Sequence, residues 1–498
     1  MATPIPANSA AFGLGEVVRA TRGSLARRGA GAAAIGVTTD SRAAGAGSLF
    51  IALKGDSHDG HRFVESAAKA NAAIAIVERG RAASFDEAAL ASIALVEVED
   101  TLVAFGDMAR AHLEAWRADA LHRVIAITGS AGKTTTKELT AALLGAVGAT
   151  HLTAGNLNNR VGVPSVVLGL LAEHRFAVLE MGMSLPGELD AITSFARPDV
   201  SLVTNVGMAH AEGVGGLEGV MREKGAVYRA LDARGVAIVN ADDALAMRSA
   251  EGTRAGLVLT FGRRESADYR LTAREPAEDG GALVTIVCSR ESIGLSPRVL
   301  PIRFPLPGEA AALDLAAALA AQEAASGSEL TVAEIEHALA GVRLEGRATL
   351  QRLGDNILVL DDTYNANPAS MRAALATLAE IAGPRRRLVV LGEMKELGTH
   401  AEQEHDALGE AVAAAGVTVA VGCGGLIDRT LTSAARNAAL EVVCAASTDE
   451  ATREILARVR PGDAILVKGS RSVGAERVVA ALREAWPKGV KAATSVPV

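Results

Sequence analysis

The sequence is poor in aromatic residues: its 498 residues include nine Phe, three Tyr and two Trp. Because 49% of the residues are nevertheless hydrophobic, the core must be built mainly from Ala, Val, Leu and Ile, as in stacked α/β layers. A hydrophobic fraction of this size, with 22% charged residues, excludes wholesale disorder. The length exceeds what one core usually supports and predicts about three domains, at roughly 150 residues each.

Cysteine and long apolar runs are also scarce. The three cysteines lie too far apart for a disulfide framework or a zinc knuckle, which favours a reducing compartment. No uninterrupted apolar run reaches the ~18 residues of a membrane span, and the best candidate, Leu313 to Ala325, is broken by Asp314, Gln322 and Glu323. The N-terminus lacks the basic and apolar segments of a secretory signal. We therefore expect a soluble, cytoplasmic protein without membrane insertion.

Positive charge is not in excess. The chain has 50 Lys and Arg against 58 Asp and Glu, a formal net charge of −8, and it contains no long basic run. Non-specific nucleic-acid binding depends on an excess of positive charge, so we expect no nucleic-acid partner. Anionic ligands would have to bind at local sites.

Three blocks can be separated along the chain: residues 1–110, 111–340 and 341–498. In the first block a polar, turn-rich stretch is followed by the apolar run Ser48 to Leu53, a helical pattern from Phe63 to Ala70 and a strand over Ala73 to Val77. This order predicts a small α/β unit.

The other two blocks alternate apolar strands with helical stretches, the pattern of parallel sheets. The second block has predicted strands at Val124 to Ile127, Phe176 to Leu179, Val200 to Thr204 and Val236 to Val239. Its segment 255–305 is richer in Arg, Glu and Thr and predicts an antiparallel extension. The third block predicts a doubly wound sheet with strands at Ile357 to Leu360, Leu388 to Leu391, Val417 to Val421, Glu441 to Cys444 and Ala464 to Val467.

The strongest local motif is a Gly-rich turn between the first strand of the second block and a helix. It comprises Thr128, Gly129, Ser130, Ala131, Gly132, Lys133, Thr134, Thr135 and Thr136. Glycines allow successive N–H groups and the helix N-terminus to face one anion, Lys133 supplies a point charge to the terminal phosphates, and the Thr134 hydroxyl can bind Mg²⁺. Ile127 stands where the strict phosphate-loop pattern has its first Gly. We predict ATP binding here.

Three further residues of the second block are candidates for the same sheet edge. Glu180 directly follows a strand, which places its carboxylate at the carboxyl end of the sheet, beside the phosphate loop. His210 also follows a strand, but a lone loop histidine is more often structural. Lys224 lies in a predicted helix, where a lysine is by default a solvated surface charge. The sequence alone leaves the last two open.

Two segments rich in Asn also follow strands or precede helices. The first contains Asn156, Asn158 and Asn159, and the second runs from Asp361 to Pro368 and includes Tyr364. Amide side chains both donate and accept hydrogen bonds, which suits the recognition of carbonyl groups and sugars, although such clusters are usually turns. In the second segment a nucleotide base and ribose could lie against the ring, carboxylates and amides.

Together these motifs closely resemble the Mur ligases of peptidoglycan precursor synthesis, over nearly the whole chain and in the same order. The family's own phosphate loop lacks the first Gly, so Ile127 supports the resemblance. The matching stretches are Thr39 to Arg42 with Leu49 to Gly55, the phosphate loop, Asn156 to Asn159 with Gly162 and Pro164, Asp362 to Pro368, Leu391 to Gly398, and Val467 to Ser472. Several of them are most similar to the member that adds D-alanyl-D-alanine, and the Asp-Asn-Pro-Arg motif of the member that recognises diaminopimelate is absent.

The resemblance implies specific roles for these residues. Thr134 and Glu180 would hold one Mg²⁺ on the ATP phosphates, and His210 with an N-carboxylated Lys224 would hold a second. Lys133, His210 and Lys224 would be catalytic. Arg347 would contact the ATP phosphates, and Asp362 and Asn365 would bind the nucleotide. Ser41 and Arg42 belong to the stretch resembling the UDP-sugar domain, and Asn156, Asn158 and Asn159 would bind substrate. The family often has Glu two residues after the lysine, where this chain has Ala226.

The implied activity is an ATP-dependent amide ligation between UDP-N-acetylmuramoyl-tripeptide and D-alanyl-D-alanine. It would proceed through an acyl phosphate, serve cell-wall biogenesis, cell shape and division, and be carried out by a monomer. The three blocks would hold the UDP-sugar, ATP and the incoming dipeptide. Three alternatives remain: a ligase of the same chemistry with another amine, such as the enzyme that adds the third residue or one like folylpolyglutamate synthetase; a phosphate-loop NTPase switch; and a non-catalytic nucleotide-binding module.

Overall fold

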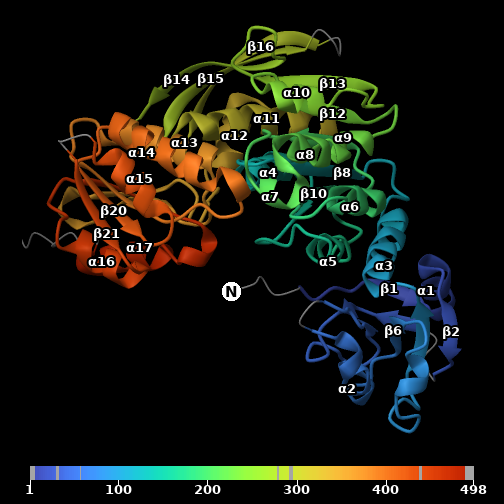
Figure 1. The fold of residues 1–498 in the computed structure, drawn as a ribbon. Helices are drawn as coiled ribbons and strands as arrows, with labels where there is room; N and C mark the ends of the chain where they lie inside the picture. Colours follow the sequence, from blue (N-terminus) through green and yellow to red (C-terminus); the bar gives the residue numbers. More distant parts are fainter. Residues whose placement is uncertain are drawn as a thin grey trace, which may run out of the picture.

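The computed structural model describes residues 6–29, 33–55, 58–277, 280–290, 295–436 and 440–487. Within these ranges the strands form three larger sheets that follow one another along the chain (Figure 1). We refer to the parts built on the five-, nine- and six-stranded sheets as the N-terminal, central and C-terminal domains. Helices pack on all three sheets, which confirms the predicted α/β class.

The N-terminal domain is a small α/β unit, as predicted. Its sheet has the order β2-β7-β6-β5-β4, in which only the β2–β7 pair is antiparallel. The strands are β2 (Ser24–Arg27), β4 (Val37–Thr38), β5 (Leu49–Ile51), β6 (Ile74–Glu78) and β7 (Ala94–Val98), and a separate antiparallel pair is formed by β1 (Ala11–Gly13) and β3 (Ala33–Ile35). The helices are α1 (Leu14–Thr21) and α2 (Val64–Lys69), with short 3₁₀ turns at Gly60–Phe63 and Ala82–Ser84.

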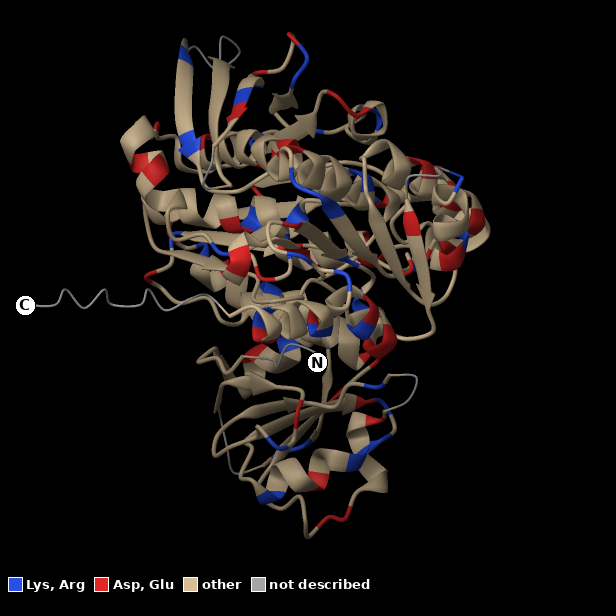
Figure 2. Cartoon of the chain, turned by 90° about the vertical axis from the view of Figure 1, so that its left-hand side faces the viewer, with Lys and Arg blue, Asp and Glu red and all other residues tan. Residues whose placement is uncertain are grey.

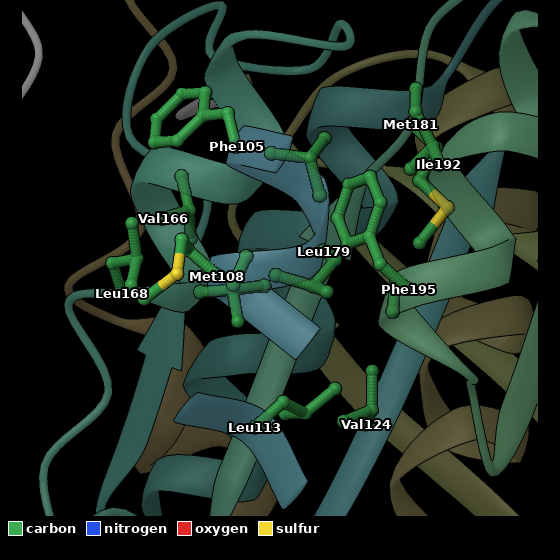
Figure 3. Close-up of a cluster of buried hydrophobic side chains, with 14 of the residues drawn as sticks. Phe105, Met108, Leu113, Val124, Val166, Leu168, Leu179, Met181, Ile192 and Phe195 are labelled. Carbon is green, nitrogen blue, oxygen red and sulfur yellow. The ribbon is translucent and has the colours of Figure 1, made fainter. Parts of the chain in front are cut away.

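One long helix, α3 (Thr101–Trp116), joins the N-terminal and central domains (Figure 1). It begins at Asp100, whose Oδ1 accepts the backbone N–H groups of Leu102 and Val103 at 2.7 and 3.1 Å, a typical N-cap. Figure 3 shows Phe105 and Met108 of this helix packed among apolar side chains of the central domain. The helix runs without interruption across residue 110, so the cores of the two domains are continuous.

The central sheet has the order β16-β15-β14-β13-β12-β11-β8-β10-β9. Its strands are β8 (Arg123–Thr128), β9 (Thr150–Leu152), β10 (Phe176–Glu180), β11 (Val200–Val203), β12 (Val236–Asn240), β13 (Leu257–Gly262), β14 (Tyr269–Pro276), β15 (Ala282–Arg290) and β16 (Leu295–Phe304). The predicted antiparallel extension over 255–305 is only partly right: β13 pairs in parallel with β12, and antiparallel pairing starts between β14 and β15. The apolar run of β13 follows helix α10 (Ala244–Ser249) and completes one more parallel unit.

Helices cover both faces of the central sheet, which explains why its strands are continuous apolar runs. One face carries α3, α5 (Gly162–Val167), α6 (Glu188–Ala196), α8 (Gly216–Lys224) and α9 (Ala226–Arg229); the other carries α4 (Lys133–Gly145), α11 (Glu309–Ser326) and α12 (Val332–Leu339). Helix α11 is buried nearly all round, which accounts for its Ala-rich composition. Among the described helices, none combines the length and apolar character that a membrane crossing requires.

The C-terminal domain is the predicted doubly wound sheet, with the order β17-β18-β22-β19-β20-β21. Only β17 is antiparallel to its neighbour. Its strands are β17 (Thr349–Arg352), β18 (Leu358–Asp362), β19 (Arg387–Leu391), β20 (Val419–Cys423), β21 (Glu441–Ala445) and β22 (Ala464–Lys468). Helices α13 (Pro368–Ala382), α14 (Ala401–Ala414) and α15 (Ile427–Ala434) cover one face, and α16 (Thr448–Leu456) and α17 (Glu476–Ala485) the other. Figure 2 shows basic and acidic residues interspersed along the chain.

Candidate functional site

A cavity of about 610 Å³ lies between the central and C-terminal domains, where the strands carrying the predicted motifs end. From the central domain it is lined by Ser130, Ala131, Gly132, Lys133, Thr135, Asn156, Asn158, Asn159, Glu180, His210 and Asp314, among others. The linker and the C-terminal domain add Arg347, Asp362, Tyr364, Asn365, Asn367, Lys468 and Arg471. The fold therefore brings the phosphate loop, the Asn cluster and the third-block segment to one place.

The phosphate loop connects β8 to α4 and has room for glycine alone at two positions. Gly129 has φ +154°, and a Cβ there would lie 1.8 Å from Oγ1 of Thr204. Gly132 has φ +81°, and a Cβ there would lie 2.5 Å from Oδ1 of Asp314. The backbone can turn this tightly because neither position carries a side chain. The last loop residues open α4, whose N-terminus faces the cavity and suits an anion.

The segment after β11 holds the phosphate loop in place. The side-chain Oδ1 of Asn205 accepts the N–H of Ala131 at 2.9 Å, and the Asn205 amide donates to the Ala131 carbonyl at 3.0 Å. Ser130 Oγ donates to the carbonyl of Gly207 at 2.9 Å and accepts its N–H at 2.8 Å. The loop is therefore fixed before any ligand arrives. Thr128, the first predicted loop residue, has a fully buried side chain at the end of β8.

Lys133 is held inside the loop that it belongs to. Its Nζ donates to the carbonyl oxygen of Gly129 at 2.7 Å. Burial lowers the pKa of the Lys133 ammonium; the Glu180 carboxylate raises it, and Arg347 lowers it further. A phosphate bound here would be stabilised by the Lys133 ammonium and by the N-terminus of the helix. The protein itself offers the ammonium only the Gly129 carbonyl and the more distant Glu180 carboxylate as partners.

The Glu180 carboxylate is buried at the end of β10, and both of its oxygens are engaged. Oε2 accepts the Thr134 hydroxyl at 2.7 Å, and Oε1 accepts the Asn158 amide at 2.8 Å. This donor set fits Mg²⁺, which takes few protein oxygens and completes its octahedron with water and phosphate oxygens. Among the described residues there is no group of three or more His, Cys, Asp or Glu that could hold a metal ion by themselves.

Lys224, the last residue of α8, is almost fully buried. Burial and the neighbouring positive charge of Lys133 hold the pKa of the Lys224 amine well below its ordinary value. The residue is therefore not the solvated surface charge that an isolated helix lysine would be. Lowering the pKa of an amine raises the fraction that is unprotonated, and the unprotonated amine is the nucleophilic form.

His210 lines the cavity from the central domain, but its Nδ1 forms an ion pair with Glu396 of the C-terminal domain. The contact with His210 is the largest cause that lowers the pKa of the Glu396 carboxyl. Both residues have backbone φ values in the left-handed region, +60° for His210 and +63° for Glu396. This pairing between the domains was not predicted, because nothing in the local sequence of either residue refers to the other.

The C-terminal side of the cavity is a cationic and aromatic wall. The guanidinium of Arg347 lies 3.9 Å from the ring centre of Tyr364, and that of Arg471 lies 5.5 Å from it. Lys468 Nζ donates to Oδ2 of Asp362 at 2.5 Å and to the Asn365 carbonyl at 2.9 Å. Arg347, Asp362 and Asn365 were predicted. Arg471 and Lys468 were not, although they lie in the Val467 to Ser472 stretch already matched to the family.

The remaining predicted residues differ in position. Asn156, Asn158 and Asn159 line the cavity, and Asn159 also caps the turn into α5 by accepting the N–H groups of Val161 and Gly162 at 3.1 and 2.8 Å. Ser41 and Arg42 do not line it. They lie in the N-terminal domain, where the exposed Arg42 guanidinium donates to the Asp40 carboxylate, the shortest contact being 2.6 Å.

Sequence reasoning missed Asp314, treated only as an interruption of an apolar run. Its carboxyl lies between the first turn of α4 and the cavity, and Oδ1 accepts the Thr136 hydroxyl at 3.1 Å. Burial raises the pKa of this carboxyl to about 8, against smaller opposing effects of Thr136 and Arg347. The available signal was a single acidic residue within the apolar stretch Ala310 to Ala321, since an unpaired charge is rarely buried without a function.

Asp314 should make the stability of the protein depend on pH. Its folded-state pKa of about 8 lies above the unfolded value, so the folded state keeps a proton that the unfolded chain loses from about pH 4 upward. The free energy of unfolding therefore falls as pH rises toward 8, by at most about 1.4 kcal/mol per pH unit from this group. Asp314→Asn is expected to remove that loss. The free energy of unfolding of the variant, measured by urea denaturation, should therefore rise relative to that of the wild type between pH 5.5 and pH 8.

The control for this comparison is Asp449→Asn, because the Asp449 side chain is 76% exposed. Its difference from the wild type should stay constant over the same range. A constant difference for Asp314→Asn as well would show that the Asp314 carboxyl ionises at its ordinary pKa.

The chain matches three family models: "Mur ligase family, catalytic domain" over residues 35–113, "Mur ligase middle domain" over residues 127–322, and "Mur ligase, glutamate ligase domain" over residues 346–471. The three matches follow the order of the N-terminal, central and C-terminal domains. They leave unmatched the segment between residues 322 and 346, which contains α12.

Individual relatives cover most of the chain. A UDP-N-acetylmuramoyl-tripeptide--D-alanyl-D-alanine ligase of Escherichia coli is 37% identical over 460 residues, 90% of this chain and 93% of that protein. The ligase of the same name from Bacillus subtilis is 33% identical over 76% of this chain and 77% of its own. Among solved structures, MurF from Acinetobacter baumannii superposes with a TM-score of 0.81 and 31% identity, covering 97% of this chain and 100% of that one. A folylpolyglutamate synthase of Mycobacterium tuberculosis (TM-score 0.60, 19% identity, 76% of this chain and 94% of that one) shares the fold.

Proposed function

The chain belongs to the Mur ligase family, and we propose on that basis that it joins D-alanyl-D-alanine to UDP-N-acetylmuramoyl-tripeptide with the hydrolysis of ATP to ADP and phosphate. The product is the UDP-N-acetylmuramoyl-pentapeptide used in peptidoglycan synthesis. The observation that carries this proposal is the match to ligases of that name across all three domains, together with a single cavity that unites the phosphate loop and Glu180.

The chemistry begins at a carboxylate, which is a poor electrophile. The terminal carboxylate of the tripeptide attacks the γ-phosphate of ATP, and an acyl phosphate and ADP are formed. The amine of D-alanyl-D-alanine then attacks the acyl carbon, and the tetrahedral intermediate expels phosphate. Lys133 and the N-terminus of α4 would stabilise the charge on the transferring phosphoryl group, since both are held in place before the reaction.

Two magnesium sites are part of the proposal. Thr134 and Glu180 would hold one ion, with Asn158 orienting the carboxylate. His210 and an N-carboxylated Lys224 would hold a second, since a carbamate replaces a repulsive ammonium by an anionic oxygen ligand. Bound Mg²⁺ would neutralise charge on the phosphate and acyl oxygens. For His210 to serve as a ligand, its ion pair with Glu396 has to open or be shared.

The substrates are assigned to the domains by the same reasoning. Residues 1–110 would bind the UDP-sugar through the stretch with Ser41 and Arg42, residues 111–340 would bind ATP, and residues 341–498 would bind the dipeptide and close over the nucleotide. Arg347 would contact the ATP phosphates, and the base and ribose would lie against the Tyr364 ring, with Asp362 and Asn365 beside them. Asn156, Asn158 and Asn159 would face the tripeptide next to the γ-phosphate.

The identity of the amine is the part that an assay can decide. Purified protein with ATP, Mg²⁺ and UDP-N-acetylmuramoyl-tripeptide should release ADP when D-alanyl-D-alanine is added, and form a product longer by two alanines by mass spectrometry. We expect no stimulation by meso-diaminopimelate, L-lysine or glutamate. Stimulation by one of these three instead of the dipeptide would identify another amide ligase, and turnover independent of any acceptor would identify an NTPase.

A further inference from the structure

One ion pair between the central and C-terminal domains is largely buried and has no role in the proposed function. It joins Arg274 of β14 to Glu380 of α13. Nη1 of Arg274 donates to Oε2 of Glu380, and Nη2 donates to Oε1 at 2.8 Å. Only 5% of the Arg274 side chain and 27% of the Glu380 side chain are exposed. Because two nitrogens meet two oxygens, the pair fixes the orientation of the side chains as well as their distance.

Glu380 does not stabilise the helix that carries it. It lies in the last turn of α13, where the free backbone carbonyl groups make the helix end negative, so a carboxylate there is unfavourable unless a cation faces it. Arg274 is that cation. If the domains separated at this point, each charge would lose its partner, and a buried charge without a partner is strongly destabilising. The pair therefore favours the arrangement of the two domains seen here.

The other end of α13 meets the phosphate loop. The side chain of Asn367, the residue before the helix, accepts the N–H of Ser370 with Oδ1 at 2.9 Å and donates from Nδ2 to the Ser130 carbonyl at 3.0 Å. One residue thus caps the helix and contacts the other domain. The helix has 15 residues and is about 22 Å long, so its two contacts with the central domain are far apart. Together they fix the direction of the helix, which a single contact would not do.

The face of α13 between these contacts lines the cavity. Ser370, Ala373 and Thr377 follow one another on it at spacings of three and four residues, and Glu380 continues the same face three residues later. Thr377 also lies against Gly308, the residue before α11, where a Cβ would come within 2.4 Å of Thr377 Oγ1. This face of the helix is therefore packed closely on the central domain.

The strand that carries Arg274 contacts the C-terminal domain through its hairpin as well. The hairpin of β14 and β15 extends from the central sheet toward the C-terminal domain (Figure 1). At its turn, a Cβ on Gly280 would come within 2.2 Å of Cδ2 of Leu350, which belongs to β17. Leu350 lies three residues after Arg347 of the linker. The hairpin therefore supports the C-terminal domain both at α13 and next to the linker.

We propose that Arg274 and Glu380 are positioning residues that act through α13 to hold the segment from Asp362 to Asn367 against the phosphate loop. Neither residue lines the cavity, so any effect on the reaction has to pass through the helix. The effect on turnover rests on the proposed function, because this segment is the proposed contact for the nucleotide base and ribose. Without the ion pair each domain should stay folded, but the angle between the two domains should vary.

The first test measures the domain arrangement and does not depend on turnover. Spin labels are placed on Cys444, the exposed cysteine of the C-terminal domain, and on Glu251→Cys, an exposed position of the central domain; Cys288 and Cys423 are buried. With Arg274 and Glu380 present, electron paramagnetic resonance should give a narrow distribution of label distances. Arg274→Met and Glu380→Gln should each broaden it.

The second test measures KM for each substrate. Arg274→Met and Glu380→Gln should each raise KM for ATP about tenfold and leave KM for the UDP-tripeptide unchanged, since the proposed contacts of the tripeptide lie in the other two domains. Arg274→Lys keeps the charge but loses the paired geometry, so its KM should lie in between. The double variant Arg274→Met/Glu380→Leu should be no worse than either single variant, because it leaves no charge unpaired.

The matched control is Arg429→Met. Arg429 also contacts a carboxylate, that of Asp406, through two nitrogens, but this pair lies within the C-terminal domain, and 42% and 47% of its side chains are exposed. The control should keep the wild-type distance distribution and KM for ATP.

Two results would overturn the proposal. If the Arg274 and Glu380 variants keep a narrow distance distribution, the ion pair does not set the domain arrangement. If they broaden it but KM for ATP stays at the wild-type value, or both KM values rise together with a lower midpoint of thermal unfolding, the pair does not position the nucleotide segment. A wild type that forms no product from D-alanyl-D-alanine would instead refute the proposed function, and the distance measurement would still decide whether the pair sets the domain arrangement.

Discussion

Lys133→Ala is expected to abolish ATP turnover, lowering the rate of phosphate release by about 10³-fold or more. The Nζ of Lys133 is the cation fixed at the phosphate loop by the Gly129 carbonyl, and burial lowers the pKa of this ammonium. The Lys133 charge would stabilise the transition state more than the bound substrates, because negative charge builds up on the transferring phosphoryl group during the reaction. The measurement is phosphate release with all three substrates present at saturating concentration.

The fold of this variant should be intact. A buried ammonium that donates to one carbonyl costs desolvation energy, so removing it is expected to leave the midpoint of thermal unfolding unchanged or slightly higher. Lys69→Ala, which removes an exposed lysine far from the cavity, should keep the wild-type rate. Substantial turnover by a well-folded Lys133→Ala protein would exclude this loop as the site of phosphoryl transfer.

The fold could be predicted where the sequence signal is local. The strands β8 and β10 were predicted almost to the residue, because a parallel strand buried on both faces must be an unbroken apolar run. The three-residue strand β9 was missed, since Thr150–Leu152 is only half-buried and pairs only with β10. The boundary of the antiparallel extension was also misplaced, because the apolar residues of β13 do not reveal the direction of their neighbour.

The residues of the site, too, could be predicted only where their sequence signal is local. The phosphate loop and Glu180 were found because glycines, lysine and a strand-terminal carboxylate form their signal within a few residues. Asp314 contacts Thr136 across 178 positions, and Asn367 donates to the Ser130 carbonyl across 237. Such contacts depend on how α11 and the C-terminal domain pack against the phosphate loop, and no single stretch of sequence encodes that packing.

Lys224→Ala is expected to be nearly inactive, with a loss of about 10²-fold or more, and to be partly rescued by added acetate or formate. Burial and Lys133 lower the pKa of the Lys224 amine, which raises the fraction with a free lone pair, the form that attacks carbon dioxide. The reaction forms an N–C bond and releases one proton, which leaves a carbamate in place of the amine. A short carboxylate diffusing into the space left by the deleted side chain would restore an anionic oxygen at the same point.

Two further comparisons make the carbamate proposal testable apart from activity. Wild-type protein equilibrated with ¹³C-bicarbonate should show a carbamate carbon resonance by NMR that is absent from Lys224→Ala and retained in Lys69→Ala, whose lysine is exposed. Lys224→Arg keeps a positive charge but cannot form the carbamate, so it should be as inactive as the alanine variant and gain nothing from acetate, because its side chain still fills the space. Wild-type rates in Lys224→Ala without any additive would show that the reaction does not require a carbamate at this position.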